Sequence, residues 1–265
     1  MKKISVLAFF LFTCVLSTTA QTSKPASAAL PRRLGVVNEY TIKHGMMAAF
    51  LQWVEKESKP LYVKAGAKEG YFFTNVYDSA SRNVVTLVEV HDNFAAIRAR
   101  NEAFAKNNSK EVLDAWNAKV REFVIDQRTY MIEFLPELSW MNPKLKSLPV
   151  YWVATERYIQ PGHVKDYENY IKNDQLPLEK KADTNGRQLA RLRYGGDGNH
   201  FFSFGFFNDL TELDPPSTII QAAGGTEAIA KMQQKLMGVV RRSETRILRL
   251  RPECSILPAS MAAAK

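Results

Sequence analysis

The segment EYTIKHG at residues 39–45 returns as ERYIQPG at residues 156–162, an offset of 117 positions. The same offset holds without a gap over residues 39–123, where composition alone would give roughly four or five identities. The aligned pairs of identical residues include Glu39/Glu156, Gly45/Gly162, Pro60/Pro177, Leu61/Leu178, Lys64/Lys181, Ala65/Ala182, Tyr77/Tyr194, Asp92/Asp209 and Ala105/Ala222. Near the end the register slips by one, so that FLPE at 134–137 matches LRPE at 250–253. A period this long predicts a duplicated domain and not a solenoid.

Hydrophobic periodicity predicts the order β-α-β-β-α-β in each copy. In the first copy we expect strands at 35–42, 71–77, 84–90 and 129–135, with helices from 46 to about 64, at 94–105 and at 110–124. In the second copy we expect strands at 152–159, 188–194, 201–207 and 246–250, with helices at 162–181 and 226–240. This order is the ferredoxin-like unit, in which two helices cover one face of a four-stranded antiparallel sheet. The predicted fold class is therefore α+β, with two tandem βαββαβ units.

Two strands are too apolar for a sheet with one wet face. Residues 201–207 (FFSFGFF) and 84–88 (VVTLV) are apolar on both alternating faces, which is typical of strands covered on both sides. The helices cover one face, so we expect the other repeat's sheet to cover the second one. Two linked halves would then pack face to face as an intrachain barrel, closed or nearly closed around a shared interior.

The chain divides into six predicted segments. Residues 1–20 combine a positive start, an apolar run and a small-residue cleavage site, which predicts a signal peptide and export to the periplasm or the medium. Residues 21–34 form a flexible leader, 35–142 the first unit, 143–149 a linker, 150–257 the second unit and 258–265 a tail. No later apolar run is long enough to span a membrane, so we expect no integral membrane segment.

Composition narrows the function classes. Loss of Lys2 and Lys3 with the signal peptide lowers the formal net charge from +9 to +7. No dense Lys/Arg tract with interleaved aromatic residues occurs, so nucleic-acid binding is not expected. Cys254 is the one cysteine after residue 20, so we expect either a buried small side chain or an intermolecular link, and no internal disulfide.

The duplicated β-α-β-β-α-β order resembles the dimeric α/β-barrel superfamily fused into one chain. The segment YIQPGHVKDY at 158–167 is similar to the strand, Pro-Gly and helix junction common in that superfamily, and TIKHG at 41–45 matches it without the proline. The superfamily includes antibiotic-biosynthesis-type monooxygenases, haem-degrading monooxygenases and NIPSNAP-like proteins. The resemblance covers residues 36–253 and implies the barrel fold. Haem-degrading relatives ligate iron through a histidine on the second helix, and neither 94–124 nor 211–242 contains one.

Glu39 and Glu156 are the first candidate site residues, because each lies at the same place in a strand covered on both faces. A buried carboxylate there costs several kcal/mol unless it is paired or protonated. We expect partners among Arg191, Arg193 and Arg249. One interpretation is an ion-pair network or a solvent-facing rim; the other is a polar pole in an aromatic cavity, which orients a ligand or acts as an acid or base.

The other candidates are Arg193 and the matched tyrosines Tyr77 and Tyr194, whose hydroxyls could donate hydrogen bonds to an oxygenated ring. The four histidines, at 44, 91, 163 and 200, show no metal-ligand spacing, and no metal or cofactor is expected. Residues 195–198 (GGDG) lack the Lys-Ser/Thr of a phosphate loop and predict a hairpin turn.

The sequence thus predicts an exported binding protein, or a cofactor-independent monooxygenase-like enzyme, for a small aromatic or lipophilic molecule. The site residues of that hypothesis are Glu39, Tyr77, Glu156, Arg193 and Tyr194. The alternative is a structural or interaction module with a solidly packed interior. We expect a monomer with two pseudo-dimeric halves, and further dimerisation stays open.

Overall fold

A computed structural model describes residues 32–77, 83–215 and 217–258. The predicted signal peptide, nearly all of the predicted leader, most of the predicted 78–83 turn and the tail beyond Pro258 lie outside these residues. The strands are β1 Leu34–Ile42, β2 Gly70–Tyr77, β3 Val84–His91, β4 Val124–Phe134, β5 Trp140–Met141, β6 Tyr151–Ile159, β7 Gly186–Tyr194, β8 His200–Phe207 and β9 Val240–Leu250. The α-helices are α1 Met47–Trp53, α2 Lys59–Lys64, α3 Phe94–Asn107, α4 Lys110–Phe123, α5 Val164–Tyr170, α6 Leu176–Lys181, α7 Thr218–Ala223 and α8 Thr226–Gln234.

Eight of the strands form a closed antiparallel barrel. The hydrogen-bonded order is β4-β1-β3-β2-β9-β6-β8-β7, and β7 pairs back to β4, while the short β5 extends from β7. Each half contributes four neighbouring strands in the same relative order. The halves join edge to edge through β2–β9 and β4–β7, which confirms the predicted closed barrel, and the inner faces of both halves share one apolar cluster. Closure removes every long unpaired edge.

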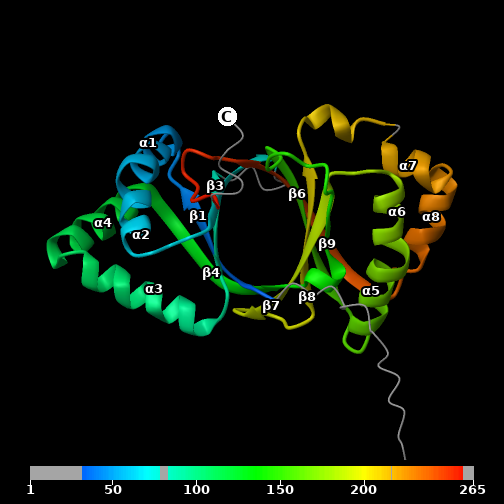
Figure 1. Cartoon of the computed structure of the whole chain (residues 1–265), viewed down its shortest axis with the longest axis horizontal. Helices are drawn as coiled ribbons and strands as arrows, with labels where there is room; N and C mark the ends of the chain where they lie inside the picture. Colours follow the sequence, from blue (N-terminus) through cyan, green and yellow to red (C-terminus); the bar gives the residue numbers. More distant parts are fainter. Residues whose placement is uncertain (1–31, 78–82, 216, 259–265) are drawn as a thin grey trace, which may run out of the picture.

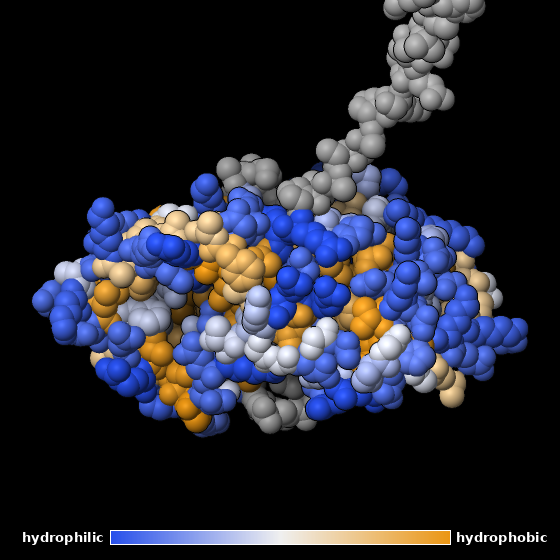
Figure 2. Space-filling view, turned by 90° about the horizontal axis from the view of Figure 1, so that it is seen from below, coloured by the Kyte–Doolittle hydropathy of each residue, from blue (hydrophilic) through white to orange (hydrophobic). Residues whose placement is uncertain are grey.

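The helices cover the outside of the barrel in two layers, with α1–α4 on one flank and α5–α8 on the other (Figure 1). Figure 2 looks from below Figure 1 and shows apolar side chains in several separate places, each bordered by hydrophilic ones. The buried apolar side chains form three clusters: one inside the barrel and one beneath each helical layer. The doubly covered strands predicted at 84–88 and 201–207 are confirmed, because β3 and β8 are buried along nearly their whole length.

Several local features match the sequence. Ser109 caps α4 by accepting a hydrogen bond from the Val112 amide, and residues 195–199 connect β7 to β8 as a turn. Each first helix contains a π-helical turn, Val54–Ser58 in one half and Ile171–Gln175 in the other, with a proline shortly after it. These two turns lie 117 positions apart. None of the helices in the described residues has both the length and the apolar character needed to cross a bilayer.

Three element boundaries were predicted wrongly. The helix expected at 226–240 ends at Gln234, and the strand expected at 246–250 begins six residues earlier, at Val240. Likewise β4 begins at Val124 and not at 129. Apart from Val124, Ile125 and Val240, the early residues of both strands are charged or polar and mostly exposed. They therefore lack the apolar alternation that marks a strand, and pairing with β6 or β1 holds them extended.

Candidate functional site

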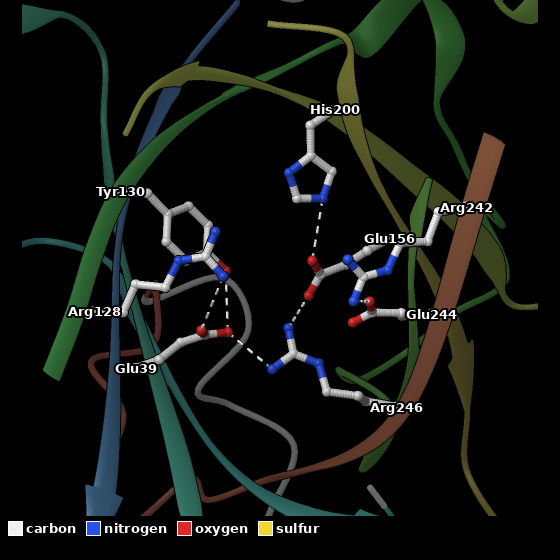
Figure 3. A network of polar contacts seen from close by, with 8 residues as sticks. All are labelled: Glu39, Arg128, Tyr130, Glu156, His200, Arg242, Glu244 and Arg246. Carbon is white, nitrogen blue, oxygen red and sulfur yellow. Dashed lines mark hydrogen bonds and ion pairs between the residues drawn. The ribbon is translucent and has the colours of Figure 1, made fainter. Parts of the chain in front are cut away.

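One end of the barrel carries a network of charged side chains that point toward one another from four strands (Figure 3). Glu39 on β1 and Glu156 on β6 occupy equivalent places, and alternation along each strand turns both toward the interior. Arg246 on β9 lies between them: its Nη1 donates to Glu39 Oε1 at 2.9 Å, and its Nη2 donates to Glu156 Oε1. The matched glutamates are therefore held by a single guanidinium.

Three further residues of the network, Tyr130, Arg128 and His200, contact these two carboxylates. The Tyr130 hydroxyl donates to Glu39 Oε1 at 3.1 Å, and Arg128 Nη1 lies 3.9 Å from Glu39 Oε2. His200 Nε2 lies 3.1 Å from Glu156 Oε2. At the solvent edge Arg242 pairs with Glu244. Glu39 and Glu156, which were both predicted to need partners, have them. The network therefore agrees with the ion-pair interpretation of these two residues.

The electrostatics of the network follow from burial and charge. The Glu156 side chain is 5% exposed; burial raises its pKa, but the neighbouring His200 and the Arg246 guanidinium outweigh burial, so the pKa lies below its usual value. Burial lowers the pKa of Arg246, but Glu156 and Glu39 more than reverse this. Burial, with the two glutamates, raises the pKa of Tyr130 well above its ordinary value, so Tyr130 stays a neutral donor.

The barrel interior behind the network is packed mainly with aromatic rings. Tyr130 stacks on Phe202 with ring centroids 5.4 Å apart, and Trp152 contacts Phe73 and Phe206 at 4.7 Å each. A void of about 30 Å³ remains, lined among others by Arg246 and Thr86. The hydroxyl of Thr86 is buried and has no hydrogen-bond partner among the described residues. The void has room for two or three waters at most, and not for an aromatic ring.

A larger cleft lies at the opposite end of the barrel. Its volume is about 640 Å³, within the range of small-molecule sites. Apolar side chains form most of its wall, including Trp140, Leu148 and Phe206, while Arg33, which pairs with Glu69, stands at its edge. Four residues line both this cleft and the internal void, namely Tyr71, Phe134, Trp152 and Gln188. The cleft, the void and Arg246 thus follow one another along the barrel.

The structure does not bring the other predicted residues to the network. Tyr77 and Tyr194 are 69% and 58% exposed, and the Tyr194 ring meets Phe94 outside the barrel. Arg191 and Arg193 lie on the outer side of β7, each 3.8 Å from Glu133. Arg249 is exposed on β9. The expectation that these arginines pair with Glu39 or Glu156 is wrong, because alternation places them on the outer surface of the barrel.

The sequence analysis missed Arg246, Tyr130, Arg128 and His200. One signal was available: with the register slip of one, Tyr130 matches Arg246 and Arg128 matches Glu244. Of the other histidines, His44 and His163 are exposed near the first helix of each half. Within the described parts of the chain, no group of three or more His, Cys, Asp or Glu is arranged to hold a metal ion. Cys254 is a free, buried thiol beneath the first helical layer.

Comparison with known proteins supports the fold. No protein-family model matches the chain, and no curated protein matches it by sequence. A Fusobacterium nucleatum protein provisionally named a monooxygenase superposes with a TM-score of 0.57 at 13% identity, over 83% of this chain and 93% of that one. A similarly named protein from Lactobacillus acidophilus gives 0.55 at 10% identity, over 82% and 93%.

An anthrone oxidase-like protein gives a TM-score of 0.57 at 12% identity and covers 87% of this chain and 98% of its own. These neighbours share the ferredoxin-like α/β-barrel architecture. At such low identity the likeness concerns the fold alone. The resemblance to NIPSNAP-like proteins stays a prediction.

Proposed function

We propose that the chain binds a small aromatic or lipophilic molecule whose ring occupies the cleft and whose polar substituent extends toward Arg246. The single observation that carries this proposal is that the cleft of about 640 Å³ and the internal void are adjacent and share four lining residues. The apolar lining suits a ring, and the void is large enough for a hydroxyl or carbonyl group. Thr86, whose hydroxyl has no partner in the described part of the chain, would bond to that group.

Binding is better supported than catalysis. Glu39 and Glu156 are both engaged by Arg246, so neither is a free acid or base in this arrangement. A monooxygenase-like reaction is the catalytic form of the proposal: a ring CH₂ would become C=O, with O₂ as oxidant and its second oxygen atom leaving as water. The neighbours named as monooxygenases motivate testing this reaction and do not establish it.

The test uses 1-naphthol and naphthalene as probes, with binding to the purified chain followed by isothermal titration calorimetry. We expect 1-naphthol to bind more tightly than naphthalene, and Leu148→Asp to weaken both by placing a charge in the cleft wall. Thr86→Val should remove the preference for 1-naphthol, and Glu39→Gln or Glu156→Gln should alter the binding of 1-naphthol only. Met237→Ala, an exposed control, should change nothing.

Two results decide between the alternatives. If neither probe binds, or if Leu148→Asp binds both as the wild type does, the cleft is not the site. The second candidate, an interaction module without a ligand, would then be favoured by the packed interior and its void of only about 30 Å³. Oxygen uptake in the presence of anthrone, which has a ring CH₂, would extend the proposal from binding to oxidation.

We further propose that the two halves arose by duplication and that the chain is exported as a monomer. Duplication is supported by the matching order of elements and by π-helical turns at the same offset as the identical residues. Export is supported by residues 1–20 alone. N-terminal sequencing of the protein recovered from the periplasm or medium, with its mass in solution, tests both export and the monomeric state.

A further inference from the structure

A second cleft lies within the second half of the chain, away from the charge network. Its volume is about 360 Å³, and its walls come from the end of α6, the start of β7, the end of β8 and the segment leading into α7. Phe206, Phe207, Leu213 and Ile219 supply apolar wall. The titratable side chains on its lining are three carboxylates, Glu179, Asp183 and Glu212, and one guanidinium, Arg187.

The floor of this cleft is the buried carboxylate of Glu179, and only one of its two oxygens accepts hydrogen bonds from described residues. The Glu179 side chain is 2% exposed. Its Oε1 accepts hydrogen bonds from Arg187 Nε and from Gln175 Nε2, the latter at 3.1 Å. Its Oε2 is buried and accepts no hydrogen bond from any residue that the structure describes. An unpaired buried oxygen of a charged group is costly, so Glu179 is expected to have a further donor.

Two more buried oxygens in the same region also lack a hydrogen-bond partner among the described residues. Thr184 Oγ1, on the cleft lining, and Gln175 Oε1, beside Glu179, have no hydrogen-bond partner within the described residues. The unsatisfied groups thus include a carboxylate oxygen, an amide oxygen and a hydroxyl, of which the first two can only accept hydrogen bonds. Glu212, also on the lining, pairs with Asn185 and backbone amides and not with a cation. A ligand that satisfies this cleft must bring hydrogen-bond donors, either N–H or O–H.

We infer that the cleft binds a small primary amine, in its ammonium form, whose hydrocarbon part lies against the apolar wall. An ammonium group supplies three donors and no acceptor. Its charge suits this lining, because Arg187 pairs with Glu179 and Lys144 with Asp183, while Glu212 has no cationic partner among the described residues. An alcohol of the same shape supplies one donor and no charge. This cleft shares one wall residue, Phe206, with the cleft of about 640 Å³, but its carboxylates lie outside that cleft and the inference does not rest on the function proposed above.

The test compares 2-phenylethylamine with 2-phenylethanol by isothermal titration calorimetry on the purified full chain. The amine should bind and the alcohol should bind at least about tenfold more weakly, because a hydrogen bond to a charged group is worth more than one to a neutral group. Glu179→Gln should weaken the binding of the amine about tenfold or more. Glu227→Gln, on the exposed face of α8, is the matched control and should bind the amine as the wild type does.

Glu179→Gln leaves Arg187 partly unpaired and could unfold the second half, so circular dichroism accompanies it. Thr184→Val keeps the side-chain shape, removes only the hydroxyl, and should weaken amine binding about threefold to tenfold. Equal affinity for amine and alcohol would overturn the inference, as would wild-type amine affinity in both Thr184→Val and a folded Glu179→Gln. Lack of amine binding by the wild-type chain would overturn it directly, whatever the naphthol experiment shows.

Discussion

Replacing Arg246 with methionine isolates the energetic role of the charge network. Among the residues that the structure describes, Arg246 is the one whose side chain pairs with both Glu39 and Glu156 (Figure 3), and methionine keeps similar bulk without the charge. Removing one partner of a buried ion pair costs about 3–5 kcal/mol, because the other charge stays buried without compensation. Glu156 keeps His200 and Glu39 keeps Tyr130. We therefore expect a loss near the lower limit, about 3 kcal/mol in the free energy of unfolding at neutral pH.

The deficit should depend on pH with a definite sign. In the wild type the pKa of Glu156 lies below its ordinary value, so its ionisation contributes stability above the pKa of the unfolded chain and loses that contribution as the pH falls through the folded pKa. In Arg246→Met, burial remains and the guanidinium is gone, so the pKa of Glu156 rises. Protonation then relieves the buried charge, and the difference between variant and wild type should shrink from pH 7 toward pH 5.

Urea unfolding followed by circular dichroism, at both pH values, measures the effect. Arg242→Met is the matched control: this arginine on the same strand is 66% exposed, and its loss should cost under about 1 kcal/mol. The triple variant with Glu39→Gln, Glu156→Gln and Arg246→Met removes the buried charges together and should regain most of the lost stability. A deficit in Arg246→Met below about 1 kcal/mol at pH 7, or one that does not change with pH, would refute this account.

Three further predictions concern other parts of the fold. Burial raises the pKa of Cys254 to about 12, so iodoacetamide at pH 8 should alkylate it in the unfolded chain and hardly at all in the native one; rapid native labelling, seen by peptide mass spectrometry, would contradict this. Gly186→Ala should cost at least about 2 kcal/mol in chemical unfolding, because the backbone φ there is +120° and the added methyl would overlap the Trp140 carbonyl oxygen; Gly198→Ala, with open space around it, should be nearly neutral. Ser58→Ala should cost about 1–2 kcal/mol, since Trp116 Nε1 donates to the buried Ser58 hydroxyl at 3.0 Å; a thermal midpoint equal to that of the wild type would show that water replaces the hydroxyl.

The local sequence pattern was enough to predict the structure where one side chain, or one period of hydrophobicity, decides the conformation of a segment. The apolar residues on both faces of 84–88 and 201–207 indicated which strands are covered on both sides, because successive side chains of a strand point to opposite sides. The same reasoning left open whether Glu39 and Glu156 face the interior or a solvent-facing rim. Arg246 was missed although it begins the strand predicted at 246–250, because no local pattern shows that this strand pairs with β6 beside Glu156.

The sequence by itself determined the α+β class, the order of elements in the two halves, the covered strands and the need of Glu39 and Glu156 for a partner. The tertiary structure decided which partner that is. Arg246 is 207 positions from Glu39, and they meet only because the barrel closes through β2–β9 and β4–β7 in one register. The clefts were likewise decided by closure, since a cleft is the volume left between side chains from distant segments and no local pattern encodes it.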